Sequence, residues 1–587
     1  MRTPNLQHLY LQKPITCVVI LCIISILPWI ITGDFSTKGE PREAAVAISM
    51  LESGNWILPY VYANEFAYKP PLAHWLMAVC SYPQGYVSEF TSRLPSAIAF
   101  IWLIASVLIF FGKRVKFQQA FISVFFLLTC VELHRAGMTT RVDMLLSVFI
   151  VLGLFRLYKW EESLHLKGLP VLIPFFLSCA ILTKGPVGVV LPLFVFGVYL
   201  LILNKYSLLT VFKSLFYVGV ASLFLPLLWY IAAWKQGGDE FLNLVLAENF
   251  GRFFSVGNLD INYSLGHENG VWYNFMTLLT GFIPWTLLFV FSLFGIKFSK
   301  PEKPLKETLK DLWIRFRSSD KVVIFSVVAL VCIIFFYSIP SSKRSVYLIP
   351  AYPFIALFLA QYALYLTEYR RLVTRFFAGF LVGLVSLVLL VCGLVMVGAL
   401  DPLSIAGQFT ARESTLEDIR LFTHVFASPS WLTVLILLLN LLAVVAVWYQ
   451  LLKKINIKIL YATIALTFVV NMLIDGVVML NLREATSSRP FAEQIMQDYP
   501  LTEQNVYVTN NLLEYPNLYG MNFYMGNRFK DFILEKPETG YFLVTAKSME
   551  KVLSEYGDQY LFTHLISTPN RIADVRDRIA LYSFQRK

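Results

Sequence analysis

Long apolar runs without charges are the feature of this sequence that most limits its fold. The run from Ile15 to Gly33 holds no charged residue, and crossing a bilayer takes about 20 apolar residues. Hydrophobic residues make up 57% of the 587-residue chain and charged residues only 15%, against about 25% in soluble domains. An ordinary soluble protein is therefore excluded, and the chain is predicted to be an α-helical polytopic membrane protein.

About 13 transmembrane helices are expected, joined by charged connectors. The first is the 15–33 run, whose apolar core is longer than that of a cleaved signal peptide. The other candidate spans cover residues 94–112, 117–131, 144–158, 169–183, 185–204, 214–234, 271–296, 322–340, 345–367, 376–400, 431–452 and 458–481. The apolar stretch 71–82 is too short to cross, so it is predicted to form a helix at the membrane interface.

The distribution of Lys and Arg predicts the orientation in the membrane. If the N-terminus is cytoplasmic, 24 of the 49 Lys and Arg residues fall on inside connectors and 13 on outside loops. The net charge of +11 is then mainly an orientation signal rather than a sign of nucleic-acid binding. The sequence therefore predicts a cytoplasmic N-terminus and an outside C-terminus.

Two regions are expected along the chain. Residues 1–481 form the transmembrane domain, with a first outer loop at 33–93 that carries juxtamembrane helices and a second large outer loop at 235–270. Residues 482–587 are polar and contain strand-like segments such as NVYVTN and GYFLVTA, which predict a small extracytoplasmic α/β domain. All seven cysteines lie in or beside apolar segments, so no disulfide framework is implied.

Cations close to the predicted outer ends of spans need a reason, because charged groups near the membrane are costly. They lie in STKGEPREA (36–44), YKPPLAHW (68–75), HRAGMTTRVD (134–143), LTKGP (182–186), ENFGRFF (248–254) and IPSSKRSVYLIP (339–350), with Glu40, Glu43, Asp143 and Glu248 as acidic partners. We expect these stretches to converge on one cavity. Lys and Arg there suit the phosphate of a lipid, and a carboxylate could serve as a general base or hold a divalent cation.

Each motif also has a simpler explanation. Pro70-Pro71 and Trp75 are typical of a broken helix at the interface, which would make Lys69 an interfacial residue. Lys184 could extend from a helix end to the water, and Asp143 could stabilise a helix N-terminus. The histidines show no metal-ligand spacing. The charges alone therefore do not choose a reaction.

Eight motifs in order carry a resemblance to a known family. They are GEPREAAVAISMLESGNWILP, YKPPLAHWLMA, RLPSAIA, TTRVDM, ILTKGPVG, ENFGRFF, YNFMTLLTGFIPWTLL and SSKRSVYLIPAYP. Up to about Pro353 the chain resembles the GT-C membrane glycosyltransferases, and among them the aminoarabinose lipid A transferase group, which is related to the protein mannosyltransferases. No P-loop or GxGxxG motif for a nucleotide is present.

The resemblance implies a GT-C fold and inverting sugar transfer from an undecaprenyl-phosphate-type donor. The acceptor would be a hydroxyl on lipid A, another glycolipid or glycan, or a protein. The reaction would take place at the outer face of the bacterial inner membrane, with the C-terminal domain in the periplasm.

The resemblance also implies roles for single residues. The family opens its first outer loop with an Asp-Glu pair two residues before an Arg, where this chain has Gly39 and Glu40 before Arg42. Glu40 is therefore the expected general base, with Asp34 as the alternative if the loop folds differently. Asp143 matches the second acidic position, and Tyr68 replaces a family Glu. The expected donor and phosphate ligands are Arg42, Lys69, Lys184, Arg252, Lys343, Arg344 and Tyr347. No cofactor is certain, and a divalent metal ion stays open.

Two other functions remain open. One is a secondary transporter of an anionic solute, but transporters place their charged sites near the bilayer midplane and are often built from repeats, whereas here the charges gather at one face. The other is a non-catalytic relative that binds lipid phosphate, which Gly39 at the family's acidic position keeps open.

Overall fold

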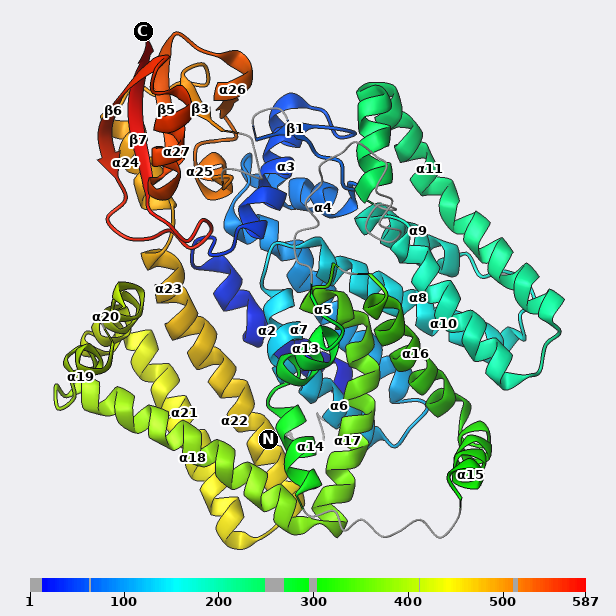
Figure 1. Ribbon diagram of the computed structural model, residues 1–587. Coiled ribbons are helices and arrows are strands. Elements are labelled where there is room, and N and C mark those ends of the chain that lie inside the picture. The colour runs from blue at the N-terminus through cyan, green and yellow to red at the C-terminus, as the bar shows by residue number, and fades with distance from the viewer. Residues whose placement is uncertain are drawn as a thin grey trace, which may run out of the picture.

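The computed structural model describes residues 13–62, 65–248, 269–294, 304–340, 342–410, 412–509 and 516–587. Long helices form a bundle, and a small domain with a β-sheet lies at one end of it (Figure 1). The predicted fold class, a helical membrane protein with a small C-terminal α/β domain, is confirmed.

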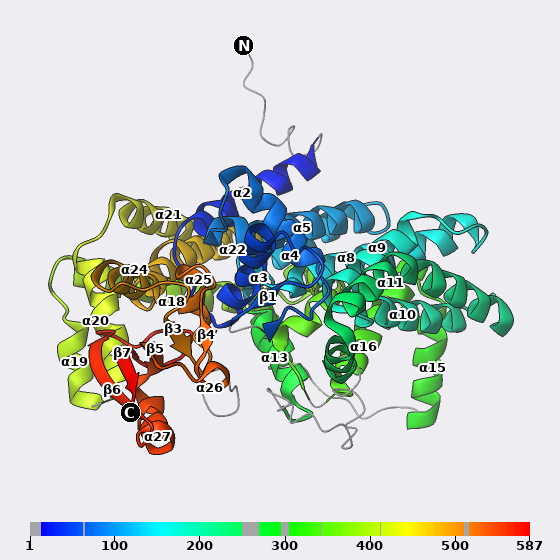
Figure 2. The same ribbon diagram turned by 90° about the horizontal axis from the view of Figure 1, so that it is seen from above.

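The first part of the chain places two short helices above the bundle. Seen from above, α3 and α4 lie over its centre, with the C-terminal domain to one side and α11 to the other (Figure 2). The helix predicted over 71–82 is present as α4. The elements are α2 (Pro14–Ile31), α3 (Gly39–Ser53), β1 (Tyr60–Val61), β2 (Glu65–Phe66), α4 (Leu72–Ser81), η1 (Tyr82–Gln84) and α5 (Glu89–Phe111).

The middle of the chain contains bent helices where straight spans were expected. The segment 117–131 is split into α6 and α7 at an angle of 67°, and 271–296 into α13 and α14 at 110° beside Pro284, which lacks the N–H a continuing helix needs. The elements are α6 (Phe117–Thr129), α7 (Val131–Gly137), α8 (Val142–Leu164), α9 (Leu172–Lys184), α10 (Val187–Leu203), α11 (Leu208–Leu246), α13 (Tyr273–Gly281), α14 (Trp285–Leu293), α15 (Leu305–Arg317) and α16 (Lys321–Ser338).

Judged by length and composition, fewer helices qualify as membrane spans than the sequence predicts. Over the described ranges, eight helices are long and apolar enough to cross a membrane, or up to ten if each bent pair is one span. Helices α9 and α10 are apolar but have only 13 and 17 residues. The count of about 13 therefore stays a prediction. The remaining helices are η3 (Ser345–Ala351), α17 (Tyr352–Tyr369), α18 (Arg371–Met396), α19 (Pro402–Phe409), α20 (Glu413–Ala427), α21 (Trp431–Lys453), α22 (Asn456–Leu473), η4 (Ile474–Met479) and α23 (Leu480–Ala485).

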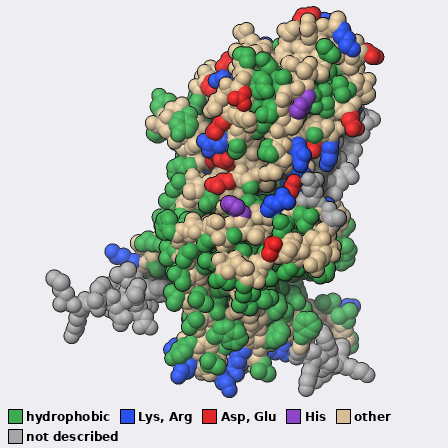
Figure 3. Space-filling view, turned by 90° about the vertical axis from the view of Figure 1, so that its left-hand side faces the viewer, with side chains coloured by type: hydrophobic (Ala, Val, Ile, Leu, Met, Phe, Trp, Pro, Cys, Tyr) green, Lys and Arg blue, Asp and Glu red, His purple; other side chains and the backbone are tan. Residues whose placement is uncertain are grey.

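Three connectors that were predicted to lie on the cytoplasmic side of the membrane meet at one place. Buried Glu161 pairs with Lys205 and Lys321, each at 3.3 Å, so three of these connectors come together. Figure 3 shows hydrophobic side chains over most of the lower half of one face, with Lys and Arg along its bottom edge. This distribution is what a protein embedded in a bilayer requires.

The C-terminal domain is built on a mixed five-stranded sheet in the order β4-β3-β5-β7-β6. β3 pairs in parallel with β4 and β5, and β7 pairs antiparallel with β5 and β6. Its elements are α24 (Arg489–Asp498), β3 (Val506–Val508), α25 (Tyr519–Tyr524), β4 (Lys530–Asp531), α26 (Phe532–Glu535), β5 (Thr539–Thr545), α27 (Ala546–Tyr556), β6 (Tyr560–Ser567) and β7 (Ile579–Arg586).

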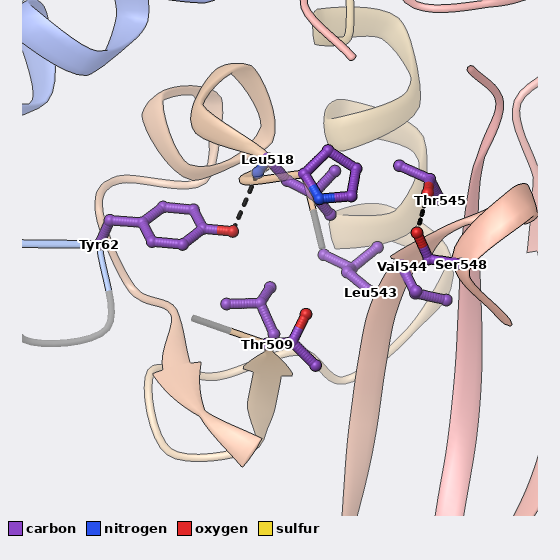
Figure 4. A pocket seen from close by; sticks show the side chains of 9 residues that line it. Tyr62, Thr509, Leu518, Leu543, Val544, Thr545 and Ser548 are labelled. Atoms are coloured by element: carbon purple, nitrogen blue, oxygen red, sulfur yellow. Dashed lines mark hydrogen bonds between the residues drawn. The ribbon is translucent and has the colours of Figure 1, made fainter. Parts of the chain in front are cut away.

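Tyr62, from the first outer loop, is inserted into the C-terminal domain. It is 1% exposed and belongs to that domain's hydrophobic core. Its hydroxyl accepts a hydrogen bond from the N–H of Leu518 at 2.9 Å (Figure 4). Its ring centroid lies 4.9 Å from that of Tyr519. The hollow drawn beside it is too small to hold a water molecule. The loop and the domain are therefore one packed unit.

Candidate active site

A carboxylate on α3 forms the first half of the candidate site. Glu43 is buried on the second turn of α3 and makes an ion pair with Lys69, which stands in the loop before α4. Its other oxygen lies 2.8 Å from Nε2 of His74 on α4, and Arg42 Nε is 3.9 Å away. One buried carboxylate thus binds a lysine and a histidine from the neighbouring loop and helix.

A second lysine–carboxylate pair lies between α8 and α9. Asp143 is in the first turn of α8, and Lys184 is the last residue of α9, where it pairs with Asp143. The helix ends there because Gly185 adopts φ 92°, a conformation open to glycine, and proline follows. The Lys184 ammonium lies 4.0 Å from the ring centroid of Tyr347 in η3. This pair is fixed from three elements.

The two pairs lie close enough for their charges to interact. Lys69 interacts electrostatically with Lys184 and with Asp143. Residues from four separate motifs are therefore brought together, as the sequence analysis expected for Lys69, Asp143, Lys184 and Tyr347. Arg42 joins them through Glu43 and through a 3.4 Å hydrogen bond to the hydroxyl of Tyr68, which donates to Glu248 at 2.9 Å.

Burial and charge set the protonation states on the α3 side. Burial alone would raise the pKa of Glu43, but the charge of Lys69 and the hydrogen bond from His74 hold that pKa well below its usual range. Burial, together with the charge of Arg42, lowers the pKa of Lys69 to about 8. At neutral pH Glu43 is ionised, while Lys69 is close to its titration range.

Glu40, the expected general base, is enclosed in a different set of contacts. It is 0% exposed and accepts hydrogen bonds from Arg93 Nε at 3.0 Å, the Thr140 N–H at 3.3 Å and the Thr37 hydroxyl at 3.3 Å. Arg93 on α5 is also 0% exposed and donates to the carbonyl oxygens of residues 33 and 34. These contacts leave Glu40 no open face toward an acceptor, so they argue against the expected role.

Asp34, the alternative base, faces the C-terminal domain instead of the two pairs. Its carboxylate accepts a hydrogen bond from Arg489 of α24 at 3.1 Å, and Arg489 lies 3.5 Å from Glu89. The structure therefore does not bring Asp34 to Lys69 or Lys184.

The remaining expected ligands lie at the edge of this group. Lys343 is 5% exposed, and its ammonium donates to the carbonyl of Asn269 at 3.1 Å. Arg344 is exposed, and Arg252 lies outside the described residues. No group of three or more His, Cys, Asp and Glu side chains able to hold a metal occurs in the described part of the chain.

Two further residues, Glu43 and His74, have a place in the site that the sequence analysis did not give them. Glu43 was noted only as an acidic partner, and His74 was set aside because it lacks metal-ligand spacing. Arg93, which was not considered, binds Glu40 outside the site. The sequence could have indicated Glu43, because it lies four residues after Gly39. Two positions four residues apart share a face if 39–53 is helical.

Comparisons with known proteins show a partial sequence similarity and a similar fold. The sequence profile of the family described as dolichyl-phosphate-mannose-protein mannosyltransferase matches residues 68–230. The fold is similar to the crystal structure of ArnT from Cupriavidus metallidurans bound to undecaprenyl phosphate, with a TM-score of 0.66, 16% sequence identity and 97% of each chain covered. The chain therefore has the fold of that ArnT structure, and residues 68–230 are similar to the mannosyltransferase family.

Sequence relatives match this chain over part of its length. The undecaprenyl phosphate-alpha-4-amino-4-deoxy-L-arabinose arabinosyl transferase of Shewanella sediminis is 24% identical over 334 residues, 56% of either protein. An uncharacterized protein of Aquifex aeolicus is 28% identical over 331 residues, 55% of this chain and 58% of the relative. Each match thus spans a little over half of the relative's length.

Proposed function

We propose that this chain is an inverting glycosyltransferase that moves a sugar from a polyprenyl-phosphate donor to an acceptor hydroxyl. The observation that carries the proposal is the pairing of Glu43 with Lys69 beside Asp143 with Lys184. Such a group supplies both a base for the hydroxyl and cations for a phosphate leaving group. The names of the ArnT relatives support a donor of the undecaprenyl-phosphate type.

Glu43 is the general base in this proposal. It removes the proton of the acceptor hydroxyl as that oxygen forms a bond to the anomeric carbon of the sugar. The bond between the anomeric carbon and the phosphate oxygen breaks, and its electron pair leaves with the polyprenyl phosphate. His74 orients the carboxylate through the 2.8 Å contact.

Lys69 and Lys184 stabilise the charge that develops on the leaving phosphate, and Arg42 lies beside them. Since Lys69 is paired with Glu43 before the donor binds, its transfer to the phosphate would release the carboxylate and make it more basic. One lysine would thus couple donor binding to activation of the base.

The proposed location is the outer face of the bacterial inner membrane. The N-terminus would be cytoplasmic, and the site and residues 482–587 periplasmic. The Lys and Arg distribution supports this orientation. The acceptor would be lipid A, another glycolipid or glycan, or a protein.

Mass spectrometry of envelope glycolipids and glycoproteins tests the function. Cells with the wild-type protein should contain an acceptor heavier by one sugar unit than cells without it, and Lys69→Ala should abolish the difference while the protein still accumulates in the membrane. Solute uptake into proteoliposomes without donor consumption would instead establish the transporter.

The lowered pKa of Lys69 predicts a pH dependence of donor binding. With a pKa of about 8 instead of 10.5, Lys69 loses its charge as the pH rises through 8. It is about nine-tenths protonated at pH 7 and about one-tenth at pH 9, so the KM for the donor should rise about tenfold between them. Steady-state kinetics in detergent or nanodiscs measure this change.

Lys69→Arg is the matched variant, because guanidinium keeps its charge throughout this range. Its KM for the donor should be nearly constant from pH 7 to 9. A wild-type KM that does not change over this range would contradict the role of Lys69 in binding the phosphate.

A further inference from the structure

Helix α15 has an apolar face that the described part of the chain leaves largely uncovered. Its sequence is LKETLKDLWIRFR, and none of its 13 residues is buried. At about 100° per residue, five apolar side chains fall within about 100° of its circumference, namely Leu305, Leu309, Leu312, Trp313 and Phe316. The first four are 48–74% exposed, and Phe316 is half-buried against the bundle. An apolar face of this width is unfavourable in water, so it requires a partner.

Helix α15 runs across the bundle at one of its ends. Seen from above, α15 is drawn lengthwise (Figure 2), and Figure 1 places it beside the lower end of α16. Helix α16 is long and apolar enough to cross a membrane, and only residues 318–320 connect α15 to it. The start of α16 is fixed, because Lys321 pairs with buried Glu161 at 3.3 Å. The apolar face of α15 therefore lies where a candidate membrane span begins.

The charges of α15 are arranged by sign around the apolar face. The four cations lie on its two flanks, about 75–115° from its centre, and are Lys306, Lys310, Arg315 and Arg317. The acidic Glu307 and Asp311 lie about 145–175° from the centre, on the opposite side of the helix. This arrangement is typical of a helix in the plane of a membrane interface, where flanking cations extend to the headgroups and acids face the water.

We propose that α15 binds the anionic phospholipids of the leaflet at this end of the bundle. Its apolar side chains lie among the acyl chains, and its four cations contact the headgroup phosphates. Lipid is favoured over a protein partner because lipid surrounds the start of a span, and because the cations and not the acids flank the apolar face. In the proposed orientation this is the inner leaflet, on the other side of the membrane from Glu43 and Lys69 (Figure 1).

The depth of Trp313 tests the insertion. The full-length protein is reconstituted into nanodiscs whose lipids carry bromine near the headgroup end of the acyl chains, because bromine quenches tryptophan fluorescence on contact. The chain contains 12 Trp, so the difference between the wild type and Trp313→Phe isolates this one signal. We expect the Trp313 signal to lose most of its intensity, and bromine at the far end of the chains to quench it less.

Deuterium exchange of the α15 amides tests the headgroup charge. Exchange over 305–317 should be about tenfold slower with phosphatidylglycerol in the nanodisc than in pure phosphatidylcholine, since an anionic surface attracts each Lys and Arg near it. Replacing the four cations by Gln should abolish this difference. The matched variant Glu307→Gln/Asp311→Asn changes the water-facing side and should keep it. The thermal stability of each variant is measured first, so that a misfolded protein is recognised.

Three results would overturn the proposal. One is a Trp313 signal that brominated lipid does not quench, another is equal exchange in the two lipid compositions, and the third is equal loss of the difference in the cationic and acidic variants. A second copy of the chain on this face would give two copies per nanodisc, reduced to one by Leu309→Ser, and would also contradict lipid as the partner. Neither measurement uses sugar transfer, so failure of the proposed function leaves this test intact.

Discussion

Replacing Glu43 by Gln is expected to lower the turnover number for sugar transfer by about 10²–10⁴-fold, the usual contribution of a general base. The amide keeps the size of the side chain and its contact with His74, but it cannot accept the proton of the acceptor hydroxyl. Single-turnover transfer of a radiolabelled sugar measures the chemical step directly. Binding of undecaprenyl phosphate should persist, since Lys69 no longer has a carboxylate to leave.

Asp143→Asn is the matched comparison. If Glu43 is the base, this variant should lose donor binding more than chemistry, because Asp143 acts by holding Lys184. If Asp143→Asn has no measurable chemical step while Glu43→Gln retains turnover near the wild-type value, then Asp143 and not Glu43 is the general base.

Replacing Glu40 by Gln should destabilise the protein by about 3–5 kcal/mol, because breaking a buried ion pair leaves one charge without compensation. Glu40 and Arg93 are both 0% exposed and lie 3.0 Å apart. Thermal unfolding in detergent, together with the yield of monodisperse protein, measures the loss.

The double variant Glu40→Gln/Arg93→Met separates structure from catalysis. Removing the second charge should restore part of the stability, giving a favourable coupling energy in the double-mutant cycle. A Glu40→Gln protein with wild-type stability but no sugar transfer would show that Glu40 is the general base.

The sequence was sufficient to predict which motifs converge, because cations at the outer ends of spans conflict with membrane insertion and need a common partner. Lys69, Asp143 and Lys184 lie far apart along the chain and come together in the structure. The pairing of Lys69 with Glu43 could not be predicted, because it depends on how α3 is rotated above the bundle.

In the structure, Arg93 near the start of α5 contacts one face of α3 through Glu40. Ser88 caps α5 through the Thr91 N–H, which starts the helix early enough to bury Arg93. Arg93 then binds Glu40, and Glu43, three residues later, is left for Lys69. The two acids of α3 thus have different partners, and no pattern along the sequence indicates which partner each one has.

The burial of Tyr62 in the core of the C-terminal domain means that the two parts are not separable modules. Proteolytic release of the tail would remove an aromatic ring from its interior and leave a void, and emptying a site of that size costs about 3–5 kcal/mol. A swap of tails between homologues would have to carry the matching outer-loop aromatic with it. Substitutions in the first outer loop therefore constrain which substitutions the C-terminal domain tolerates, and the reverse.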